Sequence, residues 1–269
     1  MIKVGIIGCG TIGSALSLAC RTRFREEVTL EAVSDIDLSR AQRLQRKLHP
    51  RPKILTTDEI IRHCDLIIEA ASTTLVYEVV KKALSLGKEV MAMSTGGLLG
   101  KEKELFELAK THRSCLYLPS GGVVGVDGLK AAKMGKIHSV SLTTRKPPQG
   151  FLDAPYVLKH RIRLNDLKDE KVLFEGDAAE AVQWFPKNIN VSATLSLAGL
   201  GARKTRVKII ACPHMKVNVH ELYVQGDFGS FYTRTENFPC KENPKTSRIA
   251  VLSAVATLER ILKNVKMGT

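Results

Sequence analysis

Three glycines near the N-terminus have a spacing that suits the binding of a phosphate group. Gly8, Gly10 and Gly13 follow an apolar run and stand where a helix is expected to begin. The first glycine permits a tight turn, the second lets backbone amides approach a pyrophosphate, and the third lets the helix pack closely on the strand. Thr11 and Ile12 fall in the same turn, where the helix N-terminus adds partial positive charge. The pattern predicts a dinucleotide site, with a ligand-free glycine turn as the alternative.

An acidic residue after the second expected strand indicates which dinucleotide binds. Asp35 follows Gly13 at about the distance expected for a carboxylate that binds the adenosine ribose hydroxyls. An acid there disfavours a 2′-phosphate, so NAD is favoured over NADP, while Arg40 nearby keeps NADP open. The alternative for Asp35 is a plain helix cap. Further walls of the site are expected where the fourth and fifth strands end, at Ala71, Ser72 and the turn 94–97.

Among the seven histidines, His220 has the surroundings best suited to proton transfer. It leads into an expected strand, and polar Asn218 and Glu221 stand close to it in the sequence. An imidazole with an unperturbed pKa of about 6.5 exchanges protons at neutral pH. The alternative is a structural histidine in a hydrogen-bonded turn.

Asn188 and Asn190 precede a segment rich in small residues. Their amides offer donors and acceptors together, which suits a nicotinamide carboxamide or a substrate carboxylate. Simple helix capping is the alternative, and the sequence leaves open which of the two would contact the cofactor.

The elements that must position these residues alternate between strand and helix as far as Pro119. Such alternation predicts a doubly wound parallel sheet of the Rossmann type. Expected strands are 4–7, 30–33, 54–55, 65–70, 89–93 and 114–118, and expected helices include 12–23, 38–48, 77–86 and 101–110.

Beyond Pro119 the pattern changes to longer, partly alternating strands at 137–145 and 221–236, with at least two helices between them. Asp177 and Glu180 form a capping-box pattern at the start of one of these helices. We therefore predict an α/β protein with an N-terminal Rossmann domain, 1–119 and 245–269, and a second α+β catalytic and dimerisation domain, 120–244. The amphipathic segment 247–263 is expected to form a helix that returns to the first sheet.

Composition favours a small-molecule partner. The net charge is +14, but the basic residues are spread along the chain and lack the interleaved aromatics that stack on bases, so no nucleic acid is expected. No apolar run is long enough for a membrane span, and no secretory signal is recognisable. Six scattered cysteines predict neither disulfides nor a metal site. These features predict a cytoplasmic protein, and an exposed sheet face in the second domain suggests a homodimer.

Five segments of the second half, in the same order, resemble the L-aspartate dehydrogenase family, and the resemblance extends essentially over the whole chain. The segments are LPSGG at 118–122, GDAAEAV at 176–182, FPKNINV at 185–191, NVHE at 218–221 and NPKTS at 243–247.

This resemblance implies NAD(P)-dependent oxidative deamination of L-aspartate to iminoaspartate, which hydrolyses to oxaloacetate and ammonia or feeds NAD biosynthesis. It implies that His220 is catalytic, and that NAD contacts an asparagine of the 188–190 stretch. It also implies a contact from the turn at Gly122, where the family usually has alanine.

A substrate with two carboxylates needs cationic or amide donors. Arg203 and Lys204 are further candidates, with a solvated surface charge as the alternative for each basic residue, and Cys212 stands where the family commonly has an acid. Rival interpretations are a relative of homoserine dehydrogenase or dihydrodipicolinate reductase, a non-catalytic NAD(P)-binding regulator, and a basic DNA-binding protein. The expected substrate contacts are Asn190, His220, Lys245 and Thr246, with Ser247 beside them.

Overall fold

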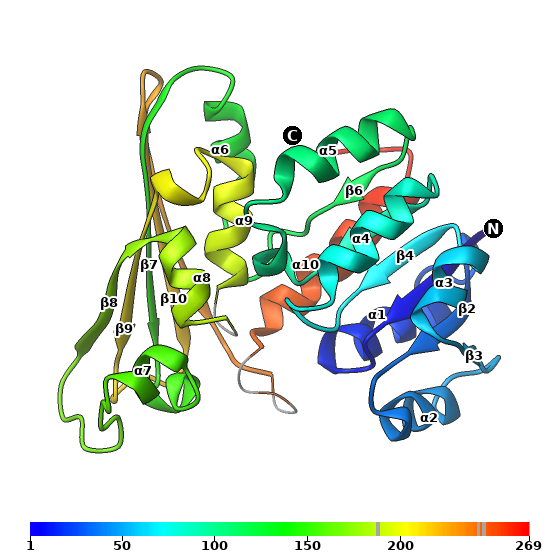
Figure 1. The fold of residues 1–269 in the computed structure, drawn as a ribbon, viewed down its shortest axis with the longest axis horizontal. Coiled ribbons are helices and arrows are strands. Elements are labelled where there is room, and N and C mark those ends of the chain that lie inside the picture. The colour runs from blue at the N-terminus through cyan, green and yellow to red at the C-terminus, as the bar shows by residue number, and fades with distance from the viewer. Residues whose placement is uncertain (187–188, 241–242, 244–245, 269) are drawn as a thin grey trace. The chain divides into compact units, whose positions relative to one another are not determined.

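The computed structural model describes residues 1–186, 189–240, 243 and 246–268. The chain forms two compact units, one of Met1–Pro119 with Val251–Lys266 and the other of Ser120–Ala250 with Met267–Thr269. Each unit contains its own β-sheet (Figure 1). The assignment of one part to cofactor binding and the other to catalysis and dimerisation stays a prediction.

The sheet of the first unit has six parallel strands in the order β3-β2-β1-β4-β5-β6. Four consecutive residues are buried in each central strand, residues 4–7 of β1 and Leu66–Glu69 of β4, because helices cover both faces. The chain order reverses between β1 and β4, which is the switch point where such folds bind ligands. The strands are β1 (Ile2–Ile7), β2 (Val28–Ser34), β3 (Lys53–Ile54), β4 (Leu66–Glu69), β5 (Glu89–Ala92) and β6 (Leu116–Tyr117).

Helices complete the first unit and confirm the predicted doubly wound parallel sheet. Leu16, Leu44 and Leu258 come from three different helices and are buried in one core cluster with the strands. The C-terminal helix therefore packs on this sheet from Val251 onward. The helices are α1 (Thr11–Thr22), α2 (Leu38–Arg46), α3 (Thr57–His63), α4 (Val76–Ser85), η1 (Thr95–Leu98), α5 (Glu102–Thr111) and α10 (Arg248–Leu262).

The second unit has a five-stranded sheet in the order β11-β10-β7-β9-β8, in which only the pair β7 and β9 is parallel among the described strands. Helices α6, α8 and α9 lie against one face, which we call the inner face, and the opposite face is the outer face (Figure 1). The elements are α6 (Val126–Ala132), β7 (Ile137–Lys146), η2 (Pro148–Phe151), α7 (Pro155–Lys159), β8 (Lys171–Asp177), α8 (Ala178–Trp184), α9 (Asn190–Ala198), η3 (Ala202–Lys204), β9 (Thr205–Ala211), β10 (Asn218–Gly226) and β11 (Gly229–Asn237).

The sequence-based description of this second unit needs correction in its details. The segment expected as one strand at 221–236 is a hairpin, β10 and β11, that turns at Asp227 and Phe228. Strands β8 and β9 were not predicted, because neither KVLFEGD nor TRVKIIA keeps the regular alternation of apolar and polar residues that marks a half-buried strand. The capping box of Asp177 and Glu180 is confirmed, since the Glu180 amide donates to Asp177 Oδ1 at 2.9 Å.

Candidate active site

The glycine turn after β1 is shaped by close backbone approaches. Gly8 has φ of 102°, and a methyl group there would lie 2.5 Å from the Ala70 carbonyl oxygen. A methyl at Gly13 would lie 1.8 Å from the carbonyl oxygen of Gly8, so α1 could not pack as it does. Gly10, in contrast, has no atom within 4 Å of where its Cβ would stand. Two of the glycines therefore build the turn, and the third leaves open space above it.

Asp35 closes the other side of this turn from the end of β2. Its Oδ2 accepts the Cys9 amide at 2.7 Å, and its Oδ1 accepts the Asp37 amide at 2.9 Å. Asp37, not Asp35, caps α2, through the Ser39 amide. The alternative of Asp35 as the helix cap is therefore wrong. A carboxylate has further lone pairs, so Asp35 can still accept ribose hydroxyls.

Glu69 was not singled out in the sequence, yet it organises the loops after β4 and β5. Its carboxylate is fully buried and accepts the amides of Ala71 and Ser72 at 2.8 and 3.1 Å. It also accepts the amide and the hydroxyl of Ser94, at 3.1 and 2.9 Å. Burial raises the pKa of Glu69, and these hydrogen bonds oppose the rise. The signal that could have revealed it is an acid that ends an otherwise apolar strand.

The turn fits a dinucleotide. Helix α1 begins at Thr11 after Gly10, no side chain caps its N-terminus, and its first turn carries no acid. Its free amides and dipole favour a phosphate, and the space above Gly10 admits one. Thr11 and Ile12 lie in this first turn, while Ala71 and Ser72 lie at the carboxyl edge of the same sheet beyond β4.

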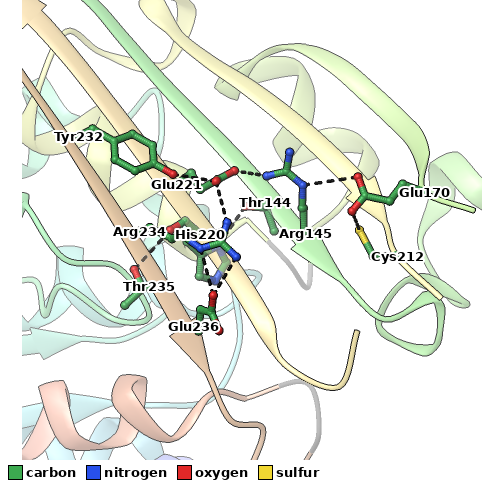
Figure 2. Close-up of polar contacts among 10 residues, drawn as sticks. All are labelled: Thr144, Arg145, Glu170, Cys212, His220, Glu221, Tyr232, Arg234, Thr235 and Glu236. Carbon is green, nitrogen blue, oxygen red and sulfur yellow. Dashed lines mark hydrogen bonds and ion pairs between the residues drawn. The ribbon is translucent and has the colours of Figure 1, made fainter. Parts of the chain in front are cut away.

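In the second unit, His220 lies on the inner face of β10 and is only 3% exposed. It is paired with Thr144 of β7 and with Thr235 of β11. The Thr144 hydroxyl is 3.0 Å from His220 Nδ1 (Figure 2). With Nδ1–H donating to Thr144, the lone pair of Nε2 is available to a substrate.

Gly122 lies beside the other ring nitrogen of His220. A methyl at Gly122 would stand 3.5 Å from His220 Nε2, 3.6 Å from Asn237 Nδ2 and 3.0 Å from Ser247 Oγ. The side-chain amide of Asn237 donates through Nδ2 to the Gly122 carbonyl at 2.7 Å. The glycine thus leaves a small space bordered by an imidazole, an amide and a hydroxyl. Asn237 was missed in the sequence because it ends a strand far along the chain.

A buried lysine affects the charge of this site. Lys146, two residues beyond Thr144 on the same strand, is 6% exposed. Burial, together with the charge of Lys146, lowers the pKa of His220 to about 3, so its imidazole is neutral at neutral pH. Burial also lowers the pKa of Lys146 to about 8.

Of the remaining sequence-predicted residues, Asn190 and Thr246 are described and Asn188 and Lys245 are not. Asn190 is exposed at the first position of α9, where Ile189 is the N-cap residue, so Asn190 is not the cap of this helix. The Thr246 hydroxyl accepts the Asn243 amide at 3.1 Å, whereas Ser247 borders the space at Gly122. Asn188 and Lys245 lie outside the described residues.

Arg203 and Lys204 lie away from the end of the second sheet that carries Thr144 and His220. They are exposed in η3, just before Thr205, which pairs with Val140 of β7. Val140 is four residues from Thr144, or about 13 Å along the strand. Arg203 and Lys204 therefore lie away from His220 along the sheet, and their binding of a substrate carboxylate stays a prediction.

On the outer face, Arg145 and Glu221 follow Thr144 and His220 directly in their strands. A network of charged residues surrounds these two side chains (Figure 2). Arg145 contacts Glu221, which also accepts Tyr232 and Arg234 at 2.7 and 2.9 Å. Burial opposes ionisation of Glu221, but these partners outweigh it and hold its pKa below the usual value.

Cys212 contacts the same network on the outer face. Its thiol donates to Glu170 at 3.1 Å, and Glu170 also contacts Arg145 (Figure 2). Burial, with the nearby Glu170, raises the pKa of Cys212 to about 12, so the thiolate is not accessible. Glu170 thus brings a carboxylate to both Arg145 and Cys212. Within the described part of the chain, no cluster of His, Cys, Asp and Glu could hold a metal ion.

Comparisons with known proteins agree with this architecture. Residues 127–261 match the family described as aspartate dehydrogenase, C-terminal, and residues 8–119 match the NAD-binding domain of homoserine dehydrogenase. An L-aspartate dehydrogenase from Methanosarcina acetivorans is 50% identical over 100% of both chains. One from Methanothermobacter thermautotrophicus is 42% identical over 100% of this chain and 99% of its own length. The crystal structure of aspartate dehydrogenase from Thermotoga maritima shares the fold, with a TM-score of 0.73 and 24% identity over 100% of both chains.

The Rossmann unit with its open glycine turn, and its match to a dehydrogenase NAD-binding domain, define an NAD(P)-dependent dehydrogenase. Within that class the chain belongs to the L-aspartate dehydrogenase family, because both the C-terminal family match and the full-length relatives carry that description.

Proposed function

We propose that this enzyme oxidatively deaminates L-aspartate to iminoaspartate, with NAD preferred over NADP. The observation that carries the proposal is the neutral, buried imidazole of His220, whose Nε2 faces the space left by Gly122. Asn237 and Ser247 border the same space and offer donors to a carboxylate.

Cofactor binding is assigned to the first unit. Gly8, Gly10 and Gly13 with the amides of Thr11 and Ile12 would hold the pyrophosphate, as the uncapped N-terminus of α1 suggests. Asp35 would accept the ribose hydroxyls and repel a 2′-phosphate. Arg40 contacts Asp37 at 3.3 Å on the surface, where it could reach a 2′-phosphate after a change of rotamer. When bound, NAD(P) supplies the acceptor for the hydride that leaves the substrate Cα.

Proton transfer is assigned to His220. The ammonium of aspartate gives one proton to Nε2, which frees the nitrogen lone pair to form the C=N bond as the hydride departs from Cα. Thr144 holds the ring through Nδ1, which keeps Nε2 as the accepting nitrogen. Water then adds to the iminium carbon and its protons pass to solvent, while the protonated imidazole can give its proton to the amino nitrogen as ammonia leaves. The products are then oxaloacetate and ammonia, unless iminoaspartate is released to NAD biosynthesis.

The remaining assignments concern neighbouring residues. Gly122 and an asparagine of the 188–190 stretch are proposed as cofactor contacts, as are Ala71 and Ser72. Asn190, Lys245 and Thr246 stay candidates for binding the substrate.

Two further proposals concern the oligomeric state and the cellular location of the enzyme. Tyr223 and Tyr232 are 39% and 56% exposed on the outer face of the second sheet, which suits a homodimer contact. All six cysteines are free thiols, as in proteins of a reducing compartment, so we propose a cytoplasmic enzyme. Among the described residues no helix is both long and apolar enough to cross a bilayer.

A substrate panel tests the proposed function. Purified protein is mixed with NAD+ or NADP+ at alkaline pH, and the absorbance of the reduced nicotinamide is followed. L-Aspartate should be oxidised at least about 100-fold more efficiently than D-aspartate, L-alanine or L-homoserine, because only L-aspartate brings both carboxylates and the correct Cα–H. NAD+ should be the better acceptor.

Two results of this panel would contradict the proposal. Faster turnover of homoserine would favour the homoserine dehydrogenase alternative. NADH binding without turnover of any of the four substrates would favour a regulator.

A further inference from the structure

The inner face of the second sheet changes from apolar to polar at one end. Moving along the paired strands β7 and β10, Val140 lies opposite Val224 and Leu142 lies opposite Leu222. All four are buried in the core beneath α6 and α9. The next inward pair is Thr144 with His220, and Lys146 follows two residues later on β7. A lysine therefore stands at an inward position of β7, beyond Val140, Leu142 and Thr144.

The placement of Lys146 is fixed by its surroundings. Its carbonyl accepts the Cys212 amide at 2.9 Å, which extends the pairing of β7 with β9. Its aliphatic stem runs past Gly150, where a methyl would lie 3.6 Å from Lys146 Cδ and 3.7 Å from Cβ. As the diagonal neighbour of His220 on the sheet, its backbone lies about 7–8 Å away. An ammonium on a four-carbon stem can therefore reach a molecule that touches His220.

Lys146 is the charged group that faces His220 from the described elements around it. Thr144 on β7, Thr235 on β11 and the turn at Gly122 contribute uncharged groups. Successive side chains of a strand point to opposite faces of the sheet. The charged residues next to Thr144, His220 and Thr235 therefore point outward, where they contact one another (Figure 2). The uncharged residues that complete the buried polar end are Asn218, Asn237 and Ser247, and the outward charged residues are Arg145, Glu221, Arg234 and Glu236.

We propose that Lys146 binds the side-chain carboxylate of the substrate, and that this contact both selects a dicarboxylic acid and enables His220 to accept the substrate proton. The proposal rests on the proposed function, because it assigns one carboxylate of L-aspartate to Lys146. It leaves the other carboxylate to the uncharged donors Asn237 and Ser247 near Gly122.

The electrostatics support this arrangement. In the free protein, burial and the positive charge of Lys146 lower the pKa of His220 to about 3, which makes it a weak base. A carboxylate beside Lys146 offsets that charge, so the pKa of His220 rises and Nε2 becomes a stronger base. The same anion favours the charged form of Lys146, whose pKa is lowered by burial to about 8. A monocarboxylic amino acid would leave both groups as they are in the free protein.

Succinate binding tests the proposal without requiring turnover. Succinate has both carboxylates of aspartate but no amine, and its binding is measured by calorimetry at pH 8 in buffers of different ionisation enthalpy. Near its pKa of about 8, Lys146 is about half protonated in the free protein, so binding should take up about half a proton. Lys146→Met keeps the length of the stem and removes the charge, so it should weaken succinate binding at least about 30-fold and abolish the proton uptake.

A matched control and a kinetic measurement complete the test. Lys208→Met removes an exposed lysine of β9 that pairs with Glu175, and it should bind succinate like the wild type. Lys146→Met should lower the preference for L-aspartate over L-alanine at least about 30-fold in kcat/KM, with NADH affinity within twofold of wild type. Succinate binding of wild-type strength by Lys146→Met, or wild-type binding without proton uptake, would overturn the assignment. Absence of aspartate oxidation with succinate binding intact would refute the proposed function and leave Lys146 as a dicarboxylate site.

Discussion

Gly10 and Gly13 lie in one turn, yet their surroundings predict opposite effects of the same substitution. Gly10→Ala places a methyl in open space, so the free energy of unfolding should stay within about 1 kcal/mol of wild type. The methyl would occupy the path of the pyrophosphate, so the NADH dissociation constant should rise at least about tenfold. Gly13→Ala places a methyl too close to the Gly8 carbonyl oxygen, so the free energy of unfolding should fall by about 3 kcal/mol. Urea unfolding and NADH fluorescence titration measure the two effects, and unchanged NADH binding by Gly10→Ala would exclude this path for the pyrophosphate.

Single residues also show which candidate site residues could be named from the sequence and which could not. The glycine spacing, Asp35 and His220 were identifiable because each stands in a local pattern or a family segment. Glu69 and Lys146 were not, because their importance depends on burial. Glu69 collects donors from two loops, and Lys146 points inward only because of the phase of β7. The signal that could have revealed Glu69 is an acid that ends an apolar strand, and for Lys146 it is a charged residue on the inward phase of β7.

At the scale of elements, parallel and mixed sheets differ in how clearly the sequence shows them. The strands of the first unit are short apolar runs between amphipathic helices, so their positions were predicted within a few residues. Strands β8 and β9 are partly exposed, and their sequences, KVLFEGD and TRVKIIA, contain charged residues among the apolar ones. Neither sequence is therefore an apolar run that marks a strand. The hairpin of β10 and β11 turns at Asp227 and Phe228, between Gly226 and Gly229, and the prediction of one continuous strand passed over these turn residues. Pairing across the sheet, which brings Thr144 to His220, is not readable from local sequence.

At the scale of the whole molecule, the outer face of the second sheet predicts a homodimer. Sedimentation velocity should give a species of twice the 29.6 kDa chain mass. Tyr223→Glu should shift it toward the monomer, because Tyr223 is 39% exposed at the centre of β10 and a carboxylate there would be buried in the contact. Phe106→Glu, on exposed helix α5 of the first unit, is the matched control and should leave the mass unchanged. A monomeric wild type at micromolar concentration would contradict the homodimer, and a dimer unaffected by Tyr223→Glu would exclude this face.

The central claim is that the buried imidazole of His220 accepts the substrate proton, and the turnover of His220→Ala tests it most directly. The account predicts that kcat for L-aspartate falls about 10³-fold, the usual range for a lost general base, while the NADH dissociation constant stays within twofold of wild type. His138→Ala, which removes an exposed histidine of β7 that contacts Asp227, should keep wild-type turnover. A His220→Ala enzyme that retains kcat within a few-fold of wild type would contradict the account.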